Sequence, residues 1–301
     1  MDQASISTLP LVSVIMTSFN RELYIAEAIE SVLASTYKNF ELIIVDDCSN
    51  DNTVVIAKKF EERDNRIKVY VNEKNLKDYP NRNCAASYAR GVYLKYVDSD
   101  DLIYPWGLEA MVDCMEKHPN AGYGLISYGL DQQSRFPIIF TPKEAYLQFY
   151  FKGSMIITGP TGSIFRRTAF ETAGGFSGIP YLGDIEMWLK MSRSYCLVAM
   201  PLQLVWWRQH QDQQIKEGTS NNYYAVNSYH LLLNNLISKD CPLLQKDKKL
   251  AIRNLKNRYC RNLMLDILKG KIKASYFFIK NYKLKFVDFL LSFQFNKYPK
   301  Y

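Results

Sequence analysis

Residues 93–101 read YLKYVDSDD, an apolar and aromatic segment that runs straight into three carboxylates. The first part is typical of a buried strand, and Asp98, Asp100 and Asp101 follow within four positions. Clustered carboxylates repel one another unless something cationic compensates them. A divalent metal that carries a phosphorylated ligand is one interpretation, because hard oxygen ligands suit Mg²⁺ or Mn²⁺. A polar turn in which Asp101 caps the next helix is the other, and this run alone does not separate the two.

The residues before this run alternate between two patterns. Asp51 or Asn52 is placed to cap one of the helices that the alternation predicts. Strand and helix in regular succession predict an α/β fold with a Rossmann-like, mostly parallel central sheet flanked by helices. Short apolar runs predict strands at residues 12–16, 40–45, 67–71 and 93–97, and apolar residues at helical spacing predict helices at 22–34, 53–60 and 82–89.

The remainder of the chain is less regular. We expect strands at 123–130 and 202–207, a loop or edge at 136–142, a polar loop at 153–164 and a helix at 184–191. From residue 221 onward the pattern is helical, and residues 211–220 contain almost nothing apolar. These shifts predict one domain over residues 1–217 and a helical C-terminal region over residues 218–301.

The composition is that of an ordinary globular protein, with 48% hydrophobic and 23% charged residues. No segment approaches the roughly 18 uninterrupted apolar residues that a membrane span requires, and we find no secretory signal. The six cysteines show no CxxC spacing. They therefore predict reduced thiols in a cytosolic compartment, without a disulfide frame or a zinc site.

The charge is unevenly distributed along the chain. Residues 246–301 contain 15 Lys and Arg against three Asp, a local net charge of +12, whereas the whole chain carries +8. Residues 1–245 therefore carry 8 − 12 = −4. Basic residues interleaved with aromatic ones suit an anionic membrane surface or a nucleic acid, and a solvated helical face or a dimer contact is the simpler alternative.

Three polar clusters follow the predicted strands, and all of them fall at the end where ligands bind in a parallel sheet. They are residues 17–20 (TSFN), residues 46–47 (DD) and residues 98–101 (DSDD). Their common location favours the functional interpretation of the acidic run over the polar turn.

In their order, these features resemble the family 2 glycosyltransferases of the GT-A fold over about residues 11 to 210. The similar segments are residues 12–20, 40–49, 82–101 and 183–189. The resemblance implies a metal-dependent, inverting transfer of one sugar from a nucleotide-diphosphate donor, with UDP preferred, to a glycan or polyprenyl-linked acceptor. It also implies Mn²⁺ or Mg²⁺ as cofactor and a place in bacterial surface-polysaccharide synthesis, such as capsule or O-antigen. Under this reading residues 1–217 form the nucleotide-sugar-binding and catalytic domain.

The resemblance assigns a group of residues to the nucleotide. Asp47 can accept the N3–H of uracil or thymine, Phe19 offers a face for stacking at roughly 1–3 kcal/mol, and Arg82 can meet a base carbonyl or a phosphate. For Phe19 a core ring and for Arg82 a surface helix residue are the alternatives. The expected nucleotide-binding residues are Thr17, Phe19, Asn20, Asp47, Arg82, Asp98 and Ser99.

Three residues are expected near the metal. Asp100 is the predicted direct ligand, and Asp98 lies toward both the ribose and the metal. His210 stands where some relatives place a histidine, although a lone histidine is more often structural. A metal between the phosphates would neutralise charge on the leaving nucleotide diphosphate.

Asp184 is the predicted general base, which removes the proton of the acceptor hydroxyl during an inverting transfer. Asp184 also fits an N-cap of the helix that follows, and Glu186 is a rival base on another side of that helix. Many members of the family carry Glu-Asp where this chain has Gly183-Asp184. That departure affects the acceptor contacts of the absent Glu and is the one feature that supports a non-catalytic nucleotide-sugar- or glycan-binding partner instead.

For the basic tail the favoured interpretation is peripheral attachment to the inner face of the cell membrane, because Lys and Arg near anionic lipid contribute about 1 kcal/mol each. No nucleic-acid motif accompanies the charge, so a nucleic-acid partner is not expected. A nucleotidyltransferase would need a Gly-rich basic loop after the first strand, and residues 17–21 (TSFNR) do not supply one.

Overall fold

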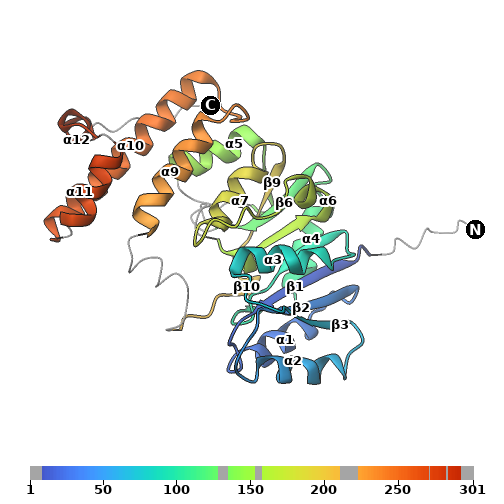
Figure 1. The fold of residues 1–301 in the computed structure, drawn as a ribbon. Helices are drawn as coiled ribbons and strands as arrows, with labels where there is room; N and C mark the ends of the chain where they lie inside the picture. Colours follow the sequence, from blue (N-terminus) through green and yellow to red (C-terminus); the bar gives the residue numbers. More distant parts are fainter. Residues whose placement is uncertain are drawn as a thin grey trace, which may run out of the picture. The chain divides into compact units, whose positions relative to one another are not determined.

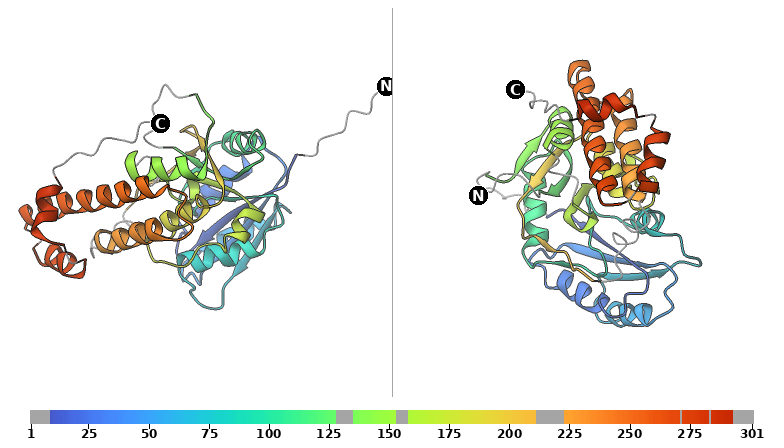
Figure 2. Two further views of the ribbon diagram at one scale, coloured as in Figure 1. Left: turned by 90° about the horizontal axis from the view of Figure 1, so that it is seen from above. Right: turned by 90° about the vertical axis from the view of Figure 1, so that its left-hand side faces the viewer.

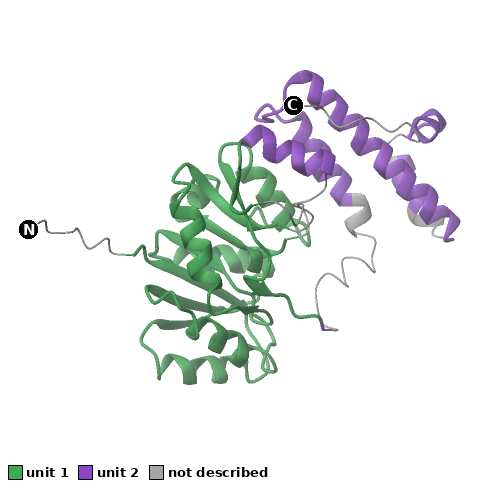
Figure 3. Cartoon of the chain, turned by 180° about the vertical axis from the view of Figure 1, so that it is seen from behind, with its two compact units in different colours: residues 1–141, 154–209 green, residues 142–153, 210–301 purple. Residues whose placement is uncertain are grey.

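The structure is a computed structural model that describes residues 9–127, 135–152, 158–210, 223–270, 272–282 and 284–292. The chain divides into two compact units (Figure 3). Unit 1 comprises residues 1–141 and 154–209, and unit 2 comprises residues 142–153 and 210–301. The predicted boundary at 217/218 and part of the predicted loop at 153–164 lie outside the described residues.

Unit 1 is built on an eight-stranded sheet in the order β3-β2-β1-β4-β8-β6-β9-β7. Strands β1 to β4 are parallel, β6 and β9 are parallel to each other, and β8 and β7 run antiparallel to their neighbours. The predicted mostly parallel α/β sheet is therefore confirmed. The strands are β1 (Val12–Ser18), β2 (Phe40–Asp46), β3 (Ile67–Val71), β4 (Tyr93–Tyr96), β6 (Ala121–Ile126), β7 (Ile138–Phe140), β8 (Ser163–Arg166) and β9 (Cys196–Met200), with β5 (Leu102–Ile103) and β10 (Val205–Trp206) in a separate antiparallel pair.

Helices cover both faces of this sheet (Figures 1 and 2). Alternate residues of β1 and β2 pack with α1, α2 and α4 in one hydrophobic cluster. On the opposite face Tyr96 packs against Phe165, Phe170 and Phe176, and its hydroxyl donates to the Arg82 carbonyl of α3. The helices of unit 1 are α1 (Ile25–Leu33), α2 (Thr53–Glu61), α3 (Asp78–Ser87), α4 (Gly107–Glu116), the short 3₁₀ turn Pro160–Gly162, α6 (Arg167–Thr172) and α7 (Gly183–Met191).

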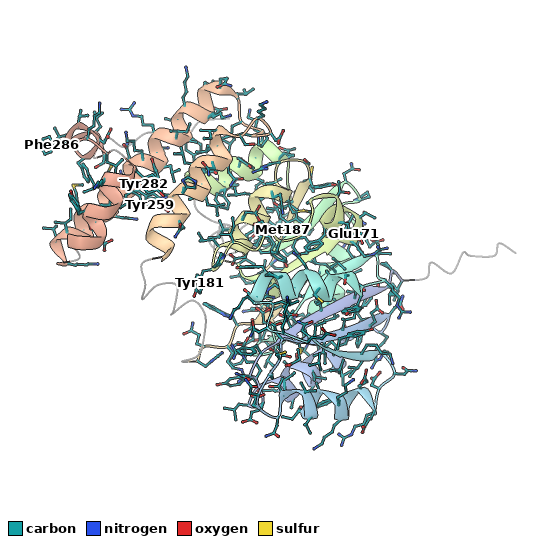
Figure 4. All side chains as sticks on the ribbon, in the orientation of Figure 1. Glu171, Tyr181, Met187, Tyr259, Tyr282 and Phe286 are labelled. Carbon is teal, nitrogen blue, oxygen red and sulfur yellow. The ribbon has the colours of Figure 1, made fainter. Side chains whose placement is uncertain are left out.

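Unit 2 is helical in the described part. Rings from three of its helices pack edge to face or stacked around Tyr229 and Phe278, and Figure 4 labels Tyr259 and Tyr282 of this cluster. Phe278, one of the aromatic residues of the basic tail, is buried and does not contribute to a surface. The elements are α5 (Pro142–Leu147) with a π-helical turn at Gln148–Lys152, α9 (Tyr223–Ile237), α10 (Gln245–Leu268), α11 (Ile272–Asn281) and α12 (Phe286–Leu291).

Several predicted elements differ in extent from the observed ones. Helix α3 begins at Asp78, four residues earlier than predicted, and β8 begins at the end of the segment expected to be a polar loop. The predicted loop or edge at 136–142 contains the edge strand β7. Asn52 occupies the N-cap of α2 without a side-chain cap, while the Asp51 carboxylate accepts the Thr53 amide. All six cysteines are free thiols, as predicted.

The start of β4 is fixed by close packing around Gly91. Its amide donates to Ser13 Oγ at 2.8 Å, and that hydroxyl donates to Glu41 Oε1 at 2.7 Å. A Cβ on Gly91 would lie 2.5 Å from the Ser13 nitrogen and 2.7 Å from the Leu11 carbonyl oxygen. Both are backbone atoms of the neighbouring strand, so the strand that delivers the acidic run tolerates no side chain at this position.

Gly91→Ala should therefore lower the free energy of unfolding by about 1–3 kcal/mol, the usual cost of overpacking. Urea denaturation of purified protein measures the change. Gly159→Ala is the matched control, because Gly159 has φ −75° and no atom within 4 Å of an added Cβ. Equal stability of the two variants would contradict the packing argument.

Candidate active site

The loops after β1 and β2 are joined at the carboxyl edge of the sheet. The buried Asp46 carboxylate accepts from Ser18 Oγ at 2.8 Å and from the Ser49 amide and hydroxyl at 2.8 and 2.6 Å. Asn20, at φ +52°, donates its amide to Ser49 Oγ and accepts the Asn50 amide on its side chain. Asn20 thus holds two loops together, and its predicted contact with a nucleotide stays a prediction.

Asp47 fixes the connection between β3 and α3. Its carboxylate accepts from Asn72 Nδ2 at 2.8 Å and from the amides of Leu76 and Lys77 at 2.7 and 2.9 Å. The residue is buried. Asp47 therefore fixes the path of the chain into α3. Its predicted contact with a nucleotide base stays a prediction.

Arg82 lies between two carboxylates. Its Nε donates to Asp78 Oδ1 at 2.7 Å and its Nη1 donates to Asp98 Oδ1 at 2.5 Å. Burial opposes the charge on Arg82, but the negative charges of Asp78 and Asp98 outweigh it and raise the pKa of Arg82 well above its usual range. Burial, only partly offset by Arg82, raises the pKa of Asp78. This ion-paired chain attaches the first turn of α3 to the end of β4.

Asp100 is paired with another arginine. Arg21 Nε donates to Asp100 Oδ2 at 2.9 Å, and Arg21 Nη1 donates to the carbonyls of Phe19 and Asn20. Both side chains are partly buried, with 19% of Arg21 and 16% of Asp100 exposed. The loop after β1 and the acidic run after β4 therefore meet through an ion pair.

Asp101 faces inward, onto a buried polar network. Its carboxylate accepts from Thr161 Oγ1 at 2.7 Å and from the Arg208 amide at 3.0 Å, and Thr161 Oγ1 also accepts the Asp98 amide. Beneath it the buried Lys95 ammonium donates to the carbonyls of Tyr96 and Thr161. The alternative in which Asp101 caps the next helix is wrong, because β5 follows Asp101 and α4 begins only at Gly107.

Burial shifts the pKa values of Lys95 and Asp101 in opposite directions, and in each case it disfavours the charged form. Burial lowers the pKa of Lys95 to about 7, against the charges of Asp98 and Asp101. Burial, reinforced by the charges of Asp98 and Asp100, raises the pKa of Asp101 far above its usual range. Lys95 and Asp101 therefore support the acidic run from inside the protein.

Asp184 is the second residue of α7, so it lies inside the first turn and not at the N-cap, which is Leu182. Its Oδ1 accepts the Ile185 amide at 2.7 Å. Burial raises the pKa of Asp184 to about 7; the Ile185 hydrogen bond opposes this shift, the Asp78 charge adds to it and Arg82 counteracts it. These interactions bring Asp184 into the same charged group as Asp78, Arg82 and Asp98.

Glu186 points elsewhere on α7. Its Oε1 lies 3.8 Å from the Lys190 ammonium, and Oε2 is buried without a hydrogen-bond partner. Gly183 is packed against Tyr79, because an added Cβ would lie 2.6–2.7 Å from atoms of the Tyr79 ring. The Tyr79 ring of α3 thus fills the space that a side chain at position 183, beside Asp184, would need.

The remaining predicted residues are placed as follows. Phe19, directly after β1, is 41% exposed, whereas Ser99 is buried. Thr17 is the sixth residue of β1, beside Val45 of β2. His210 belongs to unit 2, and its contact with a metal stays a prediction.

The acidic run fits a divalent cation in its chemistry. In the part of the chain that the structure describes, no group of three or more His, Cys, Asp and Glu side chains is arranged to hold a metal. Mg²⁺ is typically bound by one or two carboxylates together with substrate phosphates. Asp98 and Asp100 therefore suit a metal that binds together with a diphosphate, and less so one that the protein holds alone.

Sequence reasoning missed the partners of these carboxylates. The sequence predicts no role for Asp78, Thr161 or Arg208. Arg21 is mentioned there only as part of the loop that lacks the glycines of a nucleotidyltransferase. The Asp78–Arg82 spacing of four was the one available signal, since residues at i and i+4 are neighbours on a helix. The other contacts join segments 60 to 107 residues apart, for which the local sequence carries no pattern.

The fold and this arrangement define an α/β protein with a charged candidate site at the carboxyl edge of its sheet. A model of glycosyl transferase family 2 matches residues 13–174, more than half of the chain. The chain therefore belongs to glycosyl transferase family 2, which confirms the resemblance inferred from its motifs.

Several bacterial relatives share part of the chain. EpsE of Bacillus subtilis (strain 168), described as a glycosyltransferase, is 34% identical over 188 residues, which cover 60% of this chain and 66% of EpsE. WfgD of Escherichia coli, a UDP-Glc:alpha-D-GlcNAc-diphosphoundecaprenol beta-1,3-glucosyltransferase, is 43% identical over 36% of this chain and 42% of its own length. A GalNAc(5)-diNAcBac-PP-undecaprenol beta-1,3-glucosyltransferase of Campylobacter jejuni is 25% identical over 80% of this chain and 78% of its own. The matched part of the chain thus spans slightly less than two thirds of EpsE and less than half of WfgD.

Solved structures of glycosyltransferases share the fold. TarS 1–349 of S. aureus in complex with UDP-GlcNAc superposes with a TM-score of 0.64 at 20% identity, over 82% of this chain and 72% of TarS. The mannosyltransferase PcManGT of Pyrobaculum calidifontis, in complex with GDP-Man and Mn²⁺, gives a TM-score of 0.63 at 16% identity, over 95% of this chain and 84% of PcManGT. These similarities confirm the GT-A fold.

Replacing Arg82 with Met should cost about 3–5 kcal/mol of unfolding free energy, because two carboxylates would lose the cation between them. Arg82→Lys should recover little, since an ammonium cannot donate to both carboxylates as the guanidinium fork does. Lys117→Met is the control: Lys117 pairs with Asp113 at 2.6 Å, but both side chains are more than half exposed. Its loss should cost less than about 1 kcal/mol. Similar denaturation midpoints for Arg82→Met and Lys117→Met would refute the role of Arg82.

Proposed function

We propose that this family 2 glycosyltransferase transfers one sugar, with inversion, from a nucleotide-diphosphate donor to a hydroxyl of a glycan or lipid-linked acceptor, with Asp184 as general base. The donor is proposed to be a UDP-sugar. Support for UDP comes from the relative WfgD and from the UDP-GlcNAc complex of TarS.

One observation carries this proposal: the Asp184 carboxylate is held by the Ile185 amide in the first turn of α7, near the charges of Asp78 and Arg82. A general base works best when its pKa lies near the operating pH, and burial raises the pKa of Asp184 to about 7. The Ile185 amide fixes one carboxylate oxygen, which leaves the other oxygen to accept the acceptor proton. Glu186 lacks this arrangement, because its carboxyl group is directed to Lys190.

The residues of the site have separate proposed roles in binding the metal, binding the nucleotide base and removing the acceptor proton. Asp98 and Asp100 would hold a divalent metal together with the diphosphate, and that metal would neutralise charge on the leaving group. Phe19 would stack on the base and Asp47 would accept its N3–H, which places the sugar toward α7. Asp184 then takes the proton of the acceptor hydroxyl as that oxygen attacks the anomeric carbon from the face opposite the leaving diphosphate.

The proposed acceptor is linked to a polyprenyl diphosphate, and the proposed setting is bacterial surface-polysaccharide synthesis. The Escherichia coli and Campylobacter jejuni relatives are named for diphosphoundecaprenol or PP-undecaprenol substrates. In the described residues no helix is long and apolar enough to cross a bilayer. Access to a lipid-linked acceptor would then come from attachment to the cytoplasmic membrane surface.

Helix α12 is the proposed point of attachment. Five of its six residues are apolar, none is buried, and Phe286 (labelled in Figure 4) and Leu290 are 78% and 57% exposed. Residues 269–301 carry eight Lys against one Asp. An apolar helix surrounded by lysines is complementary to the interface of an anionic bilayer.

The test of the catalytic proposal is Asp184→Asn. Release of UDP from a panel of UDP-sugars should fall by about 10²-fold or more, since general-base catalysis contributes 10² to 10⁴. In the native protein the pH profile of kcat/KM should rise about tenfold per pH unit below pH 7 and level above it, because only the ionised carboxylate accepts the proton. Calorimetric binding of UDP should change by less than about twofold.

Glu186→Gln is the matched control, from the same helix turn, and should keep its activity. Thermal unfolding distinguishes a folding defect in Asp184→Asn from the loss of the general base. Burial raises the pKa of Asp184 in the folded protein, so ionisation between about pH 4 and pH 7 costs stability, and Asp184→Asn should melt no lower than the native protein at pH 8. Normal turnover by Asp184→Asn, or loss of turnover in Glu186→Gln, would disprove the assignment of the base.

The membrane proposal is tested by sedimentation with vesicles. The native chain should pellet with phosphatidylglycerol-containing vesicles and not with pure phosphatidylcholine. Phe286→Ser/Leu290→Ser should weaken binding by about tenfold or more, since each inserted side chain contributes about 1.5–3 kcal/mol. Leu9→Ser/Val55→Ser removes similar exposed apolar surface from unit 1 and is the control. Equal binding of the two double variants would exclude α12 as the attachment point.

A further inference from the structure

We propose that Arg21 is a diphosphate-binding residue that pairs with Asp100 in the ligand-free protein and exchanges this partner for the donor's phosphates. The inference rests on the proposed function, because it takes a nucleotide diphosphate as the ligand. Its consequence is that metal and nucleotide bind cooperatively.

The starting geometry is an ion pair at the position where a metal ligand is needed. Arg21 Nε donates to Asp100 Oδ2 at 2.9 Å, and both side chains are more than four-fifths buried. An oxygen that accepts from a guanidinium cannot at the same time coordinate a metal with that lone pair. Cation binding to Asp100 therefore competes with Arg21.

Arg21 can move without disturbing the backbone that carries it. The Arg21 amide donates to Thr53 Oγ1 at 2.7 Å, and the neighbouring Glu22 amide donates to Asp51 Oδ2 at 3.0 Å. These bonds fix the main chain of the loop. The guanidinium itself is held, apart from Asp100, by the carbonyls of Phe19 and Asn20 in its own exposed loop. A side-chain rotation is enough to redirect it.

The other two arginines of the acidic run are not free to exchange in this way. Arg82 is buried and donates to both Asp78 and Asp98, so its departure would leave two uncompensated carboxylates. Arg208 donates from Nε to the Asp100 carbonyl and from Nη2 to Glu27. Arg208 thus fixes the backbone of the acidic run. Among the described hydrogen bonds of these three arginines, the one to the Asp100 carboxylate comes from Arg21.

Charge gives the exchange its direction. A nucleotide diphosphate brings several negative charges, and a guanidinium binds phosphate oxygens in a two-pronged geometry. When Arg21 turns to the phosphates, Asp100 loses a positively charged partner that competes with a cation, and a bound cation in turn attracts the same phosphates. Each ligand therefore raises the affinity for the other by the same factor, as linkage requires.

Binding of Mn²⁺ and of UDP as probes tests the exchange without any transfer reaction. In the native chain, Mn²⁺ measured by electron paramagnetic resonance should bind weakly alone, and UDP should increase its affinity by about tenfold or more, which is about 1.4 kcal/mol of coupling. In Arg21→Gln, Mn²⁺ alone should bind several-fold more tightly, because Asp100 no longer has the competing partner. UDP should bind about tenfold more weakly in the presence of Mn²⁺, and the coupling should fall to the part that the direct attraction between Mn²⁺ and the phosphates supplies.

Arg66→Gln is the control, because it breaks the Arg66–Asp64 pair of 2.6 Å elsewhere in unit 1 and should leave both affinities unchanged. Arg21→Lys keeps a cation at the site and should retain part of the coupling, which guards against a folding defect in Arg21→Gln. Asp100→Asn should lose the response to Mn²⁺ in every background.

Opposite changes in the two affinities are the signature of the exchange, and a purely structural ion pair would weaken both. Unchanged coupling in Arg21→Gln, with UDP and Mn²⁺ still binding, would overturn this inference alone. Failure of the native chain to bind UDP in the presence of Mn²⁺ would overturn the proposed donor as well.

Discussion

The buried pairing of Arg82 with Asp78 and Asp98 is the interaction on which the site depends. It connects a helix on one face of the sheet to the end of the strand that carries the acidic run. Both carboxylates pair with this one guanidinium, and Arg82 opposes the rise in the pKa of Asp78 that burial causes. The same group extends to Asp184, whose protonation responds to both Asp78 and Arg82. Arg82 of α3 therefore contacts Asp98 after β4 and also affects the pKa of Asp184 on α7.

The strands of the sheet and the general location of the site could be predicted from the sequence, because both depend on local patterns. Buried strands leave continuous apolar runs, and parallel strands bring their carboxyl ends to one edge, so residues 17–20, 46–47 and 98–101 had to meet. The start of α3 could not be read as easily. The predicted helix began at Arg82, whereas Pro80 lies in the first turn of α3, where its missing N–H would have no helical partner. As a result Asp78, which lies in that first turn, went unnoticed.

Other features of the site depend on contacts between distant segments, which no local pattern encodes. Thr161 reaches the Asp98 amide and Asp101 from a segment that composition alone marked as a loop, and it belongs to a short turn that leads into β8. The inward orientation of Asp101 also follows from its partners and not from its place in the run. Of three acids within four residues, two thus pair with arginines, whereas Asp101 accepts from Thr161 and from the Arg208 amide.

The packing of Tyr79 against Gly183 links two positions that are 104 residues apart in the chain. Because the ring occupies the volume of a missing side chain, neither residue can change in size independently of the other. During divergence of related sequences, a bulkier residue at the start of α7 would have to be preceded or accompanied by a smaller one in the first turn of α3. The identity of residue 79 thereby restricts which amino acids can neighbour Asp184.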